Sequence, residues 1–275
     1  MKVFYHTDLD GECSAAIVCL YYKGSGEYIP INYGEETKFE SIKDYEKVII
    51  LDWNFNLLEN FLKLYERTTE ITLIDHHLKS MQKEFSEIKG LRSTEKSACE
   101  LTWEYFYGNS YAPDAVKLIG DFDTWKFKYI DTEKFCEGIK LHDTSPESNL
   151  WKHILNYDNK TLDIIQKGDI ALKYRNNSNT KLVKNSFEII FEGYRSIACN
   201  AAFIGPKLFD SIADKKYDIK IVFYFNGKGW VVSLYTDNDL IDVNEIAKRF
   251  GGGGHRKASG YQSKNFPFES LYNIL

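Results

Sequence analysis

Ile71-Thr72-Leu73-Ile74-Asp75-His76-His77 is the stretch that decides the fold of this chain. Its first four residues are apolar or β-branched, as is typical of a buried strand, and an acid and two imidazoles follow at once. Two other short apolar runs, Lys2-Val3-Phe4-Tyr5 and Val48-Ile49-Ile50-Leu51, also end in polar groups. Because the carboxyl ends of parallel strands meet at one edge of a sheet, we expect the three ends to lie side by side.

The polar groups at these three ends form a candidate metal site. They are His6, Asp8 and Asp10 after the first run, Asp52 after the second, and Asp75, His76 and His77 after the third. Any one of these acids could simply cap a helix. Together at one edge, the carboxylates would repel one another unless cations lay between them. Mixed carboxylate and imidazole ligands suit Mn²⁺, Fe²⁺, Co²⁺ or Zn²⁺ better than Mg²⁺ or Ca²⁺.

Strand-like and helix-like segments alternate through the first half of the chain. The strands are expected at 2–6, 28–33, 47–52 and 70–75, and the helices at 12–23, 57–67 with Asn54 as N-cap, 97–107 and 113–120. This β-α-β-β-α-β order predicts an α/β fold with a mostly parallel sheet flanked by helices.

The second half has a different pattern. Residues 162–191 favour helix but are interrupted by polar Asn176-Asn177-Ser178-Asn179. Further on, 220–225 and 230–235 flank the turn residues 226–229 and predict a hairpin, and a helix follows at 243–250. We therefore expect a catalytic domain at 1–160, a helical linker at 161–195 and a smaller α/β substrate-binding domain at 196–275.

Bulk composition narrows the class of protein. The 275 residues carry a net charge of −5, whereas proteins that hold long nucleic acids are usually basic. No apolar run approaches the roughly 20 residues of a membrane span, so a cytoplasmic protein is expected. Five scattered cysteines without a CxxC pair indicate reduced, buried thiols rather than disulfides or a zinc site.

Taken together, these motifs resemble those of the DHH phosphoesterase superfamily. His6-x-Asp8-x-Asp10-Gly11 is similar to its first motif, Asp52 to its second and Asp75-His76-His77 to its third, although some members place the first histidine two residues earlier. The fourth motif falls in 120–127, where Asp123 is the preferred acid and Asp121 the alternative. The glycine-rich residues 252–260 look like the signature of a C-terminal domain found in one branch, with nano-RNase, oligoribonuclease and pAp phosphatase members.

The resemblance implies a site with two metal ions, usually Mn²⁺, with Mg²⁺, Co²⁺ or Fe²⁺ as alternatives. One ion would be held by His6, Asp8 and Asp52, and the other by Asp10, Asp52, His76 and Asp123, so that Asp52 bridges them. Asp75 would orient an imidazole and His77 would face the substrate phosphate, which makes His77, Asp75 and Asp52 the expected catalytic residues. Gly252, Gly253, Gly254, His255 and Arg256 would bind the substrate's nucleotide or terminal phosphate; a flexible linker that ends in a glycine cap is the other reading of this segment.

The expected function is that of a metal-dependent phosphodiesterase or exonuclease that cleaves short oligonucleotides and acts as a pAp phosphatase as well. The alternatives are a cyclic or linear dinucleotide phosphodiesterase, and a nucleotide-binding regulator without activity. The partners would be short oligonucleotides or nucleotides, with neither a membrane nor a long duplex, and the protein would be a monomer or homodimer.

Overall fold

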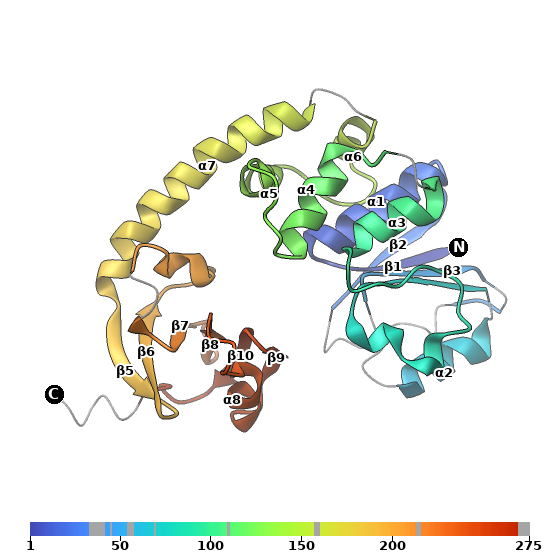
Figure 1. Cartoon of the computed structure of the whole chain (residues 1–275). Helices are drawn as coiled ribbons and strands as arrows, with labels where there is room; N and C mark the ends of the chain where they lie inside the picture. The colour runs from blue at the N-terminus through green and yellow to red at the C-terminus, as the bar shows by residue number, and fades with distance from the viewer. Residues whose placement is uncertain are drawn as a thin grey trace. The chain divides into compact units, whose positions relative to one another are not determined.

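The computed structural model divides the chain into two compact units, Met1–Leu172 and Lys173–Leu275 (Figure 1). The structure describes residues 1–32, 42–44, 46–53, 58–68, 70–108, 111–156, 160–212 and 216–268. The boundary between the units falls inside helix α7, Lys160–Leu182. The three-part division expected from the sequence stays a prediction. Among the described residues, no helix combines the length and apolar character needed to cross a bilayer.

The first unit is built on a parallel sheet, as the sequence predicted. Its strands are β1 (Lys2–His6), β2 (Glu27–Ile31), β3 (Val48–Leu51) and β4 (Ile71–Ile74), in the order β2-β1-β3-β4. All pairs between neighbouring strands are parallel. Strands β3 and β4 are buried along their whole length, which explains why they read as continuous apolar runs rather than alternating ones.

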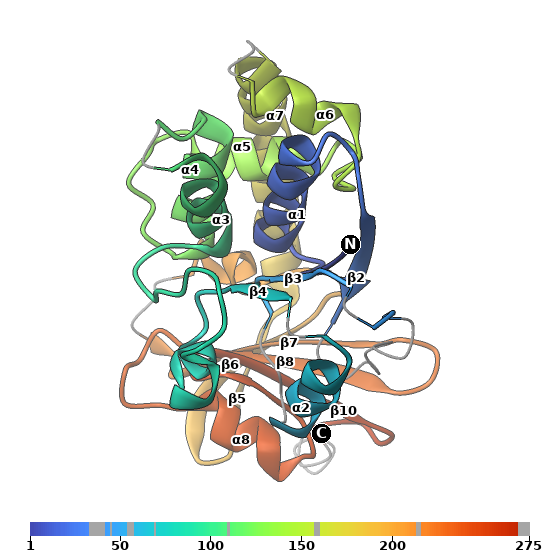
Figure 2. The same ribbon diagram turned by 90° about the vertical axis from the view of Figure 1, so that its right-hand side faces the viewer.

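Helices cover both faces of this sheet. They are α1 (Leu9–Tyr21), α2 (Leu58–Arg67), α3 (Ala98–Tyr107), α4 (Asp114–Asp123), α5 (Thr132–Ile139) and α6 (Asn149–Ile154), with short 3₁₀ turns η2 (Leu78–Met81) and η3 (Lys83–Phe85). Figure 2 shows α1 and α3 on one face and α2 on the other. Alternate strand residues serve the two faces: Tyr5 and Leu51 pack with α1 and α3, whereas Phe4 and Ile50 pack with Leu64 of α2.

The expected helices of the first unit are present, with shifted ends. Helix α1 begins at Leu9 rather than 12, because the Asp8 side chain accepts a hydrogen bond from the Gly11 N–H and caps it. The capping role expected of Asn54 for α2 lies outside the described residues. Helices α5 and α6 were not predicted. They pack with α1 and α4 in a second core that includes Phe135 and Trp151.

The described residues of the second unit form a mixed sheet and one α-helix besides the end of α7. Its strands are β5 (Phe187–Phe191), β6 (Tyr194–Asn200), β7 (Ile219–Phe225), β8 (Trp230–Tyr235), β9 (Gly253–His255) and β10 (Ala258–Ser263); its helices are α8 (Val243–Arg249) and the 3₁₀ turns η4 (Val183–Asn185) and η5 (Pro206–Phe209). The order is β5-β6-β7-β8-β10-β9, and only β6 and β7 are parallel. The predicted hairpin is β7–β8, and the predicted helix with its Asp242 cap is α8.

One prediction about the second half is wrong. The asparagine-rich stretch 176–179 does not interrupt a helix, because α7 continues through it to Leu182. Asn179 is buried, and the Thr180 hydroxyl donates to the Asn176 carbonyl, 2.9 Å away, within the same helix. Asparagine costs well under 1 kcal/mol per position in a helix, so a helix of this length tolerates it. Strand β5 follows where the sequence pattern still favoured helix.

Candidate metal centre

The end of β1 and the start of α1 carry the first three candidate ligands. Gly11 makes this junction possible, since a Cβ there would lie 2.1 Å from the His6 carbonyl oxygen. The close approach brings the His6 Nδ1 to 2.8 Å from Asp8 Oδ2. The glycine of the first motif therefore has a steric reason, and it fixes the imidazole against the carboxylate that caps α1.

Asp10 points the other way, into the protein. It is 1% exposed, and its carboxylate accepts N–H groups from Ala98 at 2.7 Å and Cys99 at 2.9 Å. These are the first N–H groups of α3, where a carboxylate is stabilised by the helix dipole. Sequence reasoning missed this support, although the capping box of Ser97 with Glu100, which the structure contains, marks where α3 begins.

Asp52 lies at the centre of the site. It follows β3 in a left-handed conformation with φ 53° and is 1% exposed. Among the residues that the structure describes, none makes a hydrogen bond to either of its carboxylate oxygens. The imidazole nitrogens of His76 and His6 lie 3.2 Å and 3.7 Å away, but neither contact is aligned as a hydrogen bond. A buried carboxylate without donors is costly, and it needs a positive charge beside it.

The end of β4 supplies two imidazoles with different surroundings. His76 Nε2 lies 3.2 Å from Asp52 Oδ1 and 3.5 Å from Asp123 Oδ2. His77 Nδ1 lies 2.7 Å from Oδ1 of the fully buried Asp75. An ionised carboxylate can only accept, so Nδ1 of His77 carries the hydrogen in this contact.

The two acids of the expected fourth motif are separated by the structure. Asp123, the last residue of α4, joins Asp10 and His76 in one cluster. Asp121 is turned away from that cluster, and its carboxylate accepts the N–H groups of Lys128 at 2.9 Å and Tyr129 at 3.2 Å, and the Thr132 hydroxyl at 2.5 Å. The geometry therefore favours Asp123 as the ligand, and Asp121 organises the loop after α4.

Three overlapping groups of side chains could each hold a metal ion. They are His6 with Asp8 and Asp52, Asp10 with His76 and Asp123, and Asp52 with His76 and His77, and within each group the ligand atoms lie within 4.8 Å of one another. The first group is the set expected for one ion. The second is the set expected for the other, apart from Asp52. Asp52 and His76 each belong to two groups, as bridging or neighbouring ions would require.

The electrostatics of the cluster show how much negative charge is confined there. Burial, and then the neighbouring Asp10, raises the pKa of Asp52 well above its ordinary value. Burial and Asp10 likewise raise the pKa of Asp123 to about 8. The carboxylates of Asp52 and Asp8 raise the pKa of His6 to about 10. Divalent metal ions would relieve this repulsion between carboxylates, so the buried oxygens of Asp52 fit a metal site.

The glycine-rich segment lies in the second unit, between α8 and β10. Gly251 has φ 76° and ends α8. A Cβ on Gly252 would lie 2.1 Å from the Gly260 carbonyl oxygen, whereas one on Gly253 would meet nothing closer than 3.8 Å. Packing therefore explains Gly252 but leaves Gly253 without a steric reason. Together with Gly254 and His255, Gly253 forms β9.

Arg256 of the same segment already has partners. Its Nη2 donates to the Asp239 carbonyl oxygen at 2.8 Å, and its Nη1 lies 3.9 Å from Asp242 Oδ2. These contacts fix the guanidinium against the β8–α8 connection. Anion binding by this segment stays a prediction.

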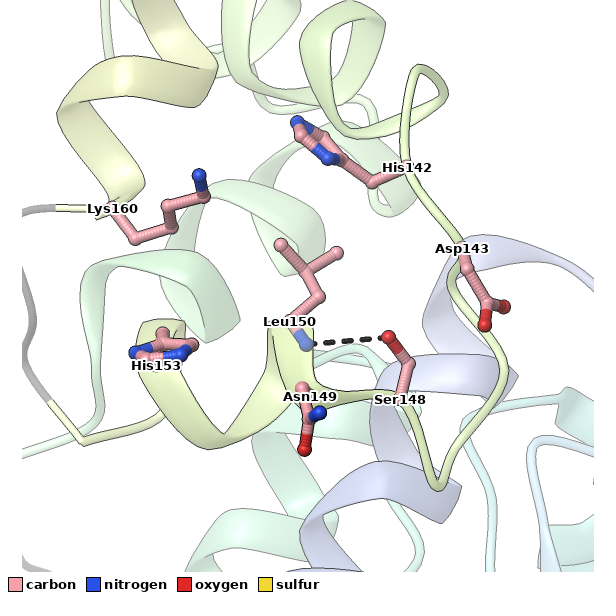
Figure 3. Close-up of a pocket in the computed structure, with 7 residues that line it drawn as sticks. All are labelled: His142, Asp143, Ser148, Asn149, Leu150, His153 and Lys160. Atoms are coloured by element: carbon pink, nitrogen blue, oxygen red, sulfur yellow. Dashed lines mark hydrogen bonds between the residues drawn. The ribbon is translucent and has the colours of Figure 1, made fainter.

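A separate hollow of about 410 Å³ lies in the first unit between α6 and the start of α7. Figure 3 shows His142, His153 and Lys160 around it. None of the clustered acids or imidazoles lines this hollow. His142 and His153 therefore lie at this hollow and not in the metal cluster. His153 offers a control position for experiments on the cluster.

Sequence comparison relates the first unit, which carries the metal cluster, to the DHH phosphoesterases. Residues 2–121 match the DHH family, N-terminal domain. It is 27% identical over 305 residues to an uncharacterized protein of Acanthamoeba polyphaga mimivirus, a match that covers 98% of this chain and 70% of the relative. It is 23% identical over 294 residues to the oligoribonuclease NrnB of Bacillus subtilis, covering 94% of this chain and 71% of that protein.

Solved structures share the fold at lower identity. The pGpG-specific phosphodiesterase PggH from Vibrio cholerae has a TM-score of 0.61 at 12% identity, over 99% of this chain and 96% of that one. Exonuclease RecJ bound to manganese has a TM-score of 0.54 at 12% identity, over 99% of this chain and 88% of that one. These likenesses bear out the α/β first unit, the helical segment and the mixed-sheet second unit.

Proposed function

We propose that this protein is a metal-dependent phosphodiesterase that hydrolyses short oligonucleotides through two divalent ions, with Mn²⁺ the expected metal. The observation that carries the proposal is the cluster of acids and imidazoles around Asp52, whose buried carboxylate receives no hydrogen bond from the described part of the chain. Similarity to the oligoribonuclease NrnB supports the substrate class.

The residues present would divide the metal binding between them. His6, Asp8 and Asp52 would hold one ion, and Asp10, His76 and Asp123, with Asp52 shared, would hold the other. When bound, two such ions supply a strong nucleophile near neutral pH and neutralise charge on a phosphoryl group. The N–H groups of Ala98 and Cys99 would keep Asp10 ionised and oriented for this role.

His77 is the group in this cluster that can move a proton. Its Nδ1 is bound to Asp75, 2.7 Å away, and this contact orients the ring. Both ring nitrogens of an imidazolium carry a proton, so Nε2 can give one up while Nδ1 keeps its bond to Asp75. We assign to His77 the transfer of that proton to the leaving oxygen of the substrate, and to Asp75 the positioning of His77.

Charge supports short substrates. Affinity for long nucleic acids comes from many phosphate contacts with basic residues, and a chain with net charge −5 offers few of them. We therefore expect rates to fall steeply beyond about five nucleotides, since each added phosphate is repelled by the net negative charge and gains no further contact.

The test is hydrolysis of 5′-labelled RNAs of two to twenty nucleotides with Mn²⁺ and with EDTA, alongside pAp and linear and cyclic dinucleotides. We expect Mn²⁺-dependent cleavage that is fastest on the shortest RNAs. His77→Asn should lower kcat far more than it lowers Mn²⁺ binding, because His77 is assigned to proton transfer. His153→Ala, in the separate hollow, is the matched control and should behave as the wild type.

Three results would count against this function. Absence of turnover with every metal would indicate a nucleotide-binding regulator. Hydrolysis confined to cyclic or linear dinucleotides would replace oligonucleotides with signalling dinucleotides as the substrate. Equal rates on two- and twenty-nucleotide RNAs would remove the preference for short chains.

A further inference from the structure

The loop that follows α4 exposes a row of aromatic side chains close to the metal centre. All six residues 125–130 are exposed. Trp125 is 65% exposed, Tyr129 49% and Phe127 37%. The rings of Trp125 and Phe127 meet edge to face, with centroids 5.7 Å apart. Large aromatic side chains are normally used to fill cores and interfaces, so a cluster left open to solvent marks a binding surface.

The backbone of this loop is strained at its aromatic residues. Trp125 has φ 54° and Phe127 has φ 46°, a left-handed conformation that bulky residues rarely adopt. Such conformations persist only where surrounding structure enforces them, and they gather at functional sites. Here Asp121 enforces it: its carbonyl accepts the Lys126 N–H at 3.1 Å and its carboxylate accepts the N–H groups of Lys128 and Tyr129.

A second hydrogen bond holds the loop against the segment before α3. Lys126 Nζ donates to the Glu95 carbonyl oxygen at 2.5 Å, in the segment that precedes α3. The loop is therefore held between α3 and the end of α4, while its rings stay open.

The loop is joined to the metal cluster by the chain itself. Asp123 belongs to the cluster, and Trp125 comes two residues later. Since consecutive Cα atoms are 3.8 Å apart, the two Cα atoms lie within roughly 7.6 Å of each other. The indole is thus within reach of a base whose phosphate sits at the metal cluster.

We propose that Trp125 and Phe127, with Tyr129 beside them, form a stacking platform for a nucleobase next to the scissile phosphate. The inference rests on the proposed function and refines its substrate class. Every base has a π-face, so stacking favours a nucleotide over a base-free phosphodiester without choosing among bases. The platform therefore selects nucleotides as a class.

Fluorescence tests the platform without relying on turnover. Trp125 is strongly exposed, whereas Trp53, Trp103 and Trp151 are buried, so a ligand that stacks on it should quench the tryptophan emission. With Mn²⁺ present, adenosine 5′-monophosphate should quench and ribose 5-phosphate should not. Trp125→Phe should remove the quenching. No difference between the two ligands on the wild-type protein would overturn the proposal.

Kinetics test its contribution to selection. Trp125→Ala should lower kcat/KM for a dinucleotide by about 10- to 100-fold, mainly through KM, and Trp125→Phe should restore most of it. In Trp125→Ala, the ratio of kcat/KM for the dinucleotide to kcat/KM for an abasic dinucleotide should fall as well. Tyr111→Ala is the matched control, because Tyr111 is 68% exposed and precedes the opposite end of α4.

The outcomes separate this proposal from the function on which it rests. A wild-type protein that cleaves neither substrate refutes the proposed hydrolysis, and the quenching experiment then decides whether the platform binds bases. A Trp125→Ala variant that keeps its full preference for the dinucleotide over the abasic dinucleotide refutes the platform and leaves the proposed hydrolysis standing.

Discussion

Two aspartates of α4 that are two positions apart have different surroundings, and this decides which of them can bind a metal. Residues two apart on a helix point about 200° away from each other. Asp123 therefore reaches His76 while Asp121 reaches the backbone of the following loop. The sequence placed both acids in the motif but could not choose between them from residue types alone, because the choice depends on the rotation of α4 against the sheet.

Substitution of each aspartate by asparagine should separate these roles. Asp123→Asn should abolish the rise in melting temperature that Mn²⁺ produces and leave the metal-free protein as stable as before. Asp121→Asn should keep the Mn²⁺ response but destabilise the fold by about 1–3 kcal/mol, because the N–H groups of Lys128 and Tyr129 and the buried Thr132 hydroxyl lose a charged acceptor. Thermal unfolding with Mn²⁺ and with EDTA measures both, and the reverse pattern would make Asp121 the ligand.

Acid should weaken the contribution of Asp121. Burial raises its pKa, but the Thr132 hydroxyl and the N–H groups of Lys128 and Tyr129 outweigh this and leave the pKa below its ordinary value. A lowered folded-state pKa means stability that is fully present above the unfolded value of about 3.9 and is lost as the pH falls through the folded value. The difference in melting temperature between the wild type and Asp121→Asn should therefore shrink below about pH 4, and a constant difference would contradict this.

Asp52 offers the sharpest test of the cluster. Asp52→Asn removes a buried carboxylate to which no described residue donates a hydrogen bond, so the metal-free variant should unfold at the same temperature as the metal-free wild type or at a higher one. Its Mn²⁺-induced stabilisation should disappear. Its activity should fall by more than about 100-fold, since replacing a residue that only hydrogen-bonds to a metal ligand already lowers metal affinity or activity about 10- to 100-fold. Calorimetry with and without Mn²⁺ decides, and undiminished Mn²⁺ stabilisation of Asp52→Asn would exclude the bridging role.

At the scale of elements, the strands were predictable and the helix crossings were not. Buried apolar runs such as 48–51 and 71–74 identify parallel strands because both of their faces are covered. The contact between α5 and α7 has no such signature. A Cβ on Gly138 would lie 2.1 Å from the Ile164 carbonyl oxygen, and one on Gly168 would lie 1.7 Å from the Lys134 carbonyl oxygen. Single glycines inside helices do not reveal their partner in a sequence.

This crossing predicts an unusual response to alanine. In a helix interior, glycine to alanine ordinarily stabilises by about 1 kcal/mol. Gly168→Ala should instead destabilise by about 1–3 kcal/mol, because the added methyl would overlap the backbone of α5. Urea unfolding measures it, with Gly205→Ala as control, since a Cβ on Gly205 meets nothing within 4 Å. A stabilised Gly168→Ala variant would show that the helices do not cross so closely.

At the scale of the whole molecule, composition predicted free buried thiols, and the structure bears this out. All five cysteines are free and buried. Burial raises the pKa of the Cys136 thiol to about 12 and raises that of Cys99. The division into two units could not be located from composition, because the long helix α7 belongs to both. Polar residues within it resemble a linker but are helical.

The positions of the thiols make them reporters of how the two units unfold. Cys199 is the one cysteine in the second unit; Cys13, Cys19, Cys99 and Cys136 belong to the first. In native buffer at pH 8 we expect none to react with Ellman's reagent at the rate of a free thiol, because the reagent needs an accessible thiolate. In rising urea the labelling should divide into two classes, with Cys199 in one and the other four together, because each unit has its own core.

Mass spectrometry of the labelled peptides assigns each cysteine to its class. Mn²⁺ should slow the labelling of the class of four only, since every clustered acid and imidazole lies in the first unit. Simultaneous labelling of all five at every urea concentration would instead mean that the two units unfold as one.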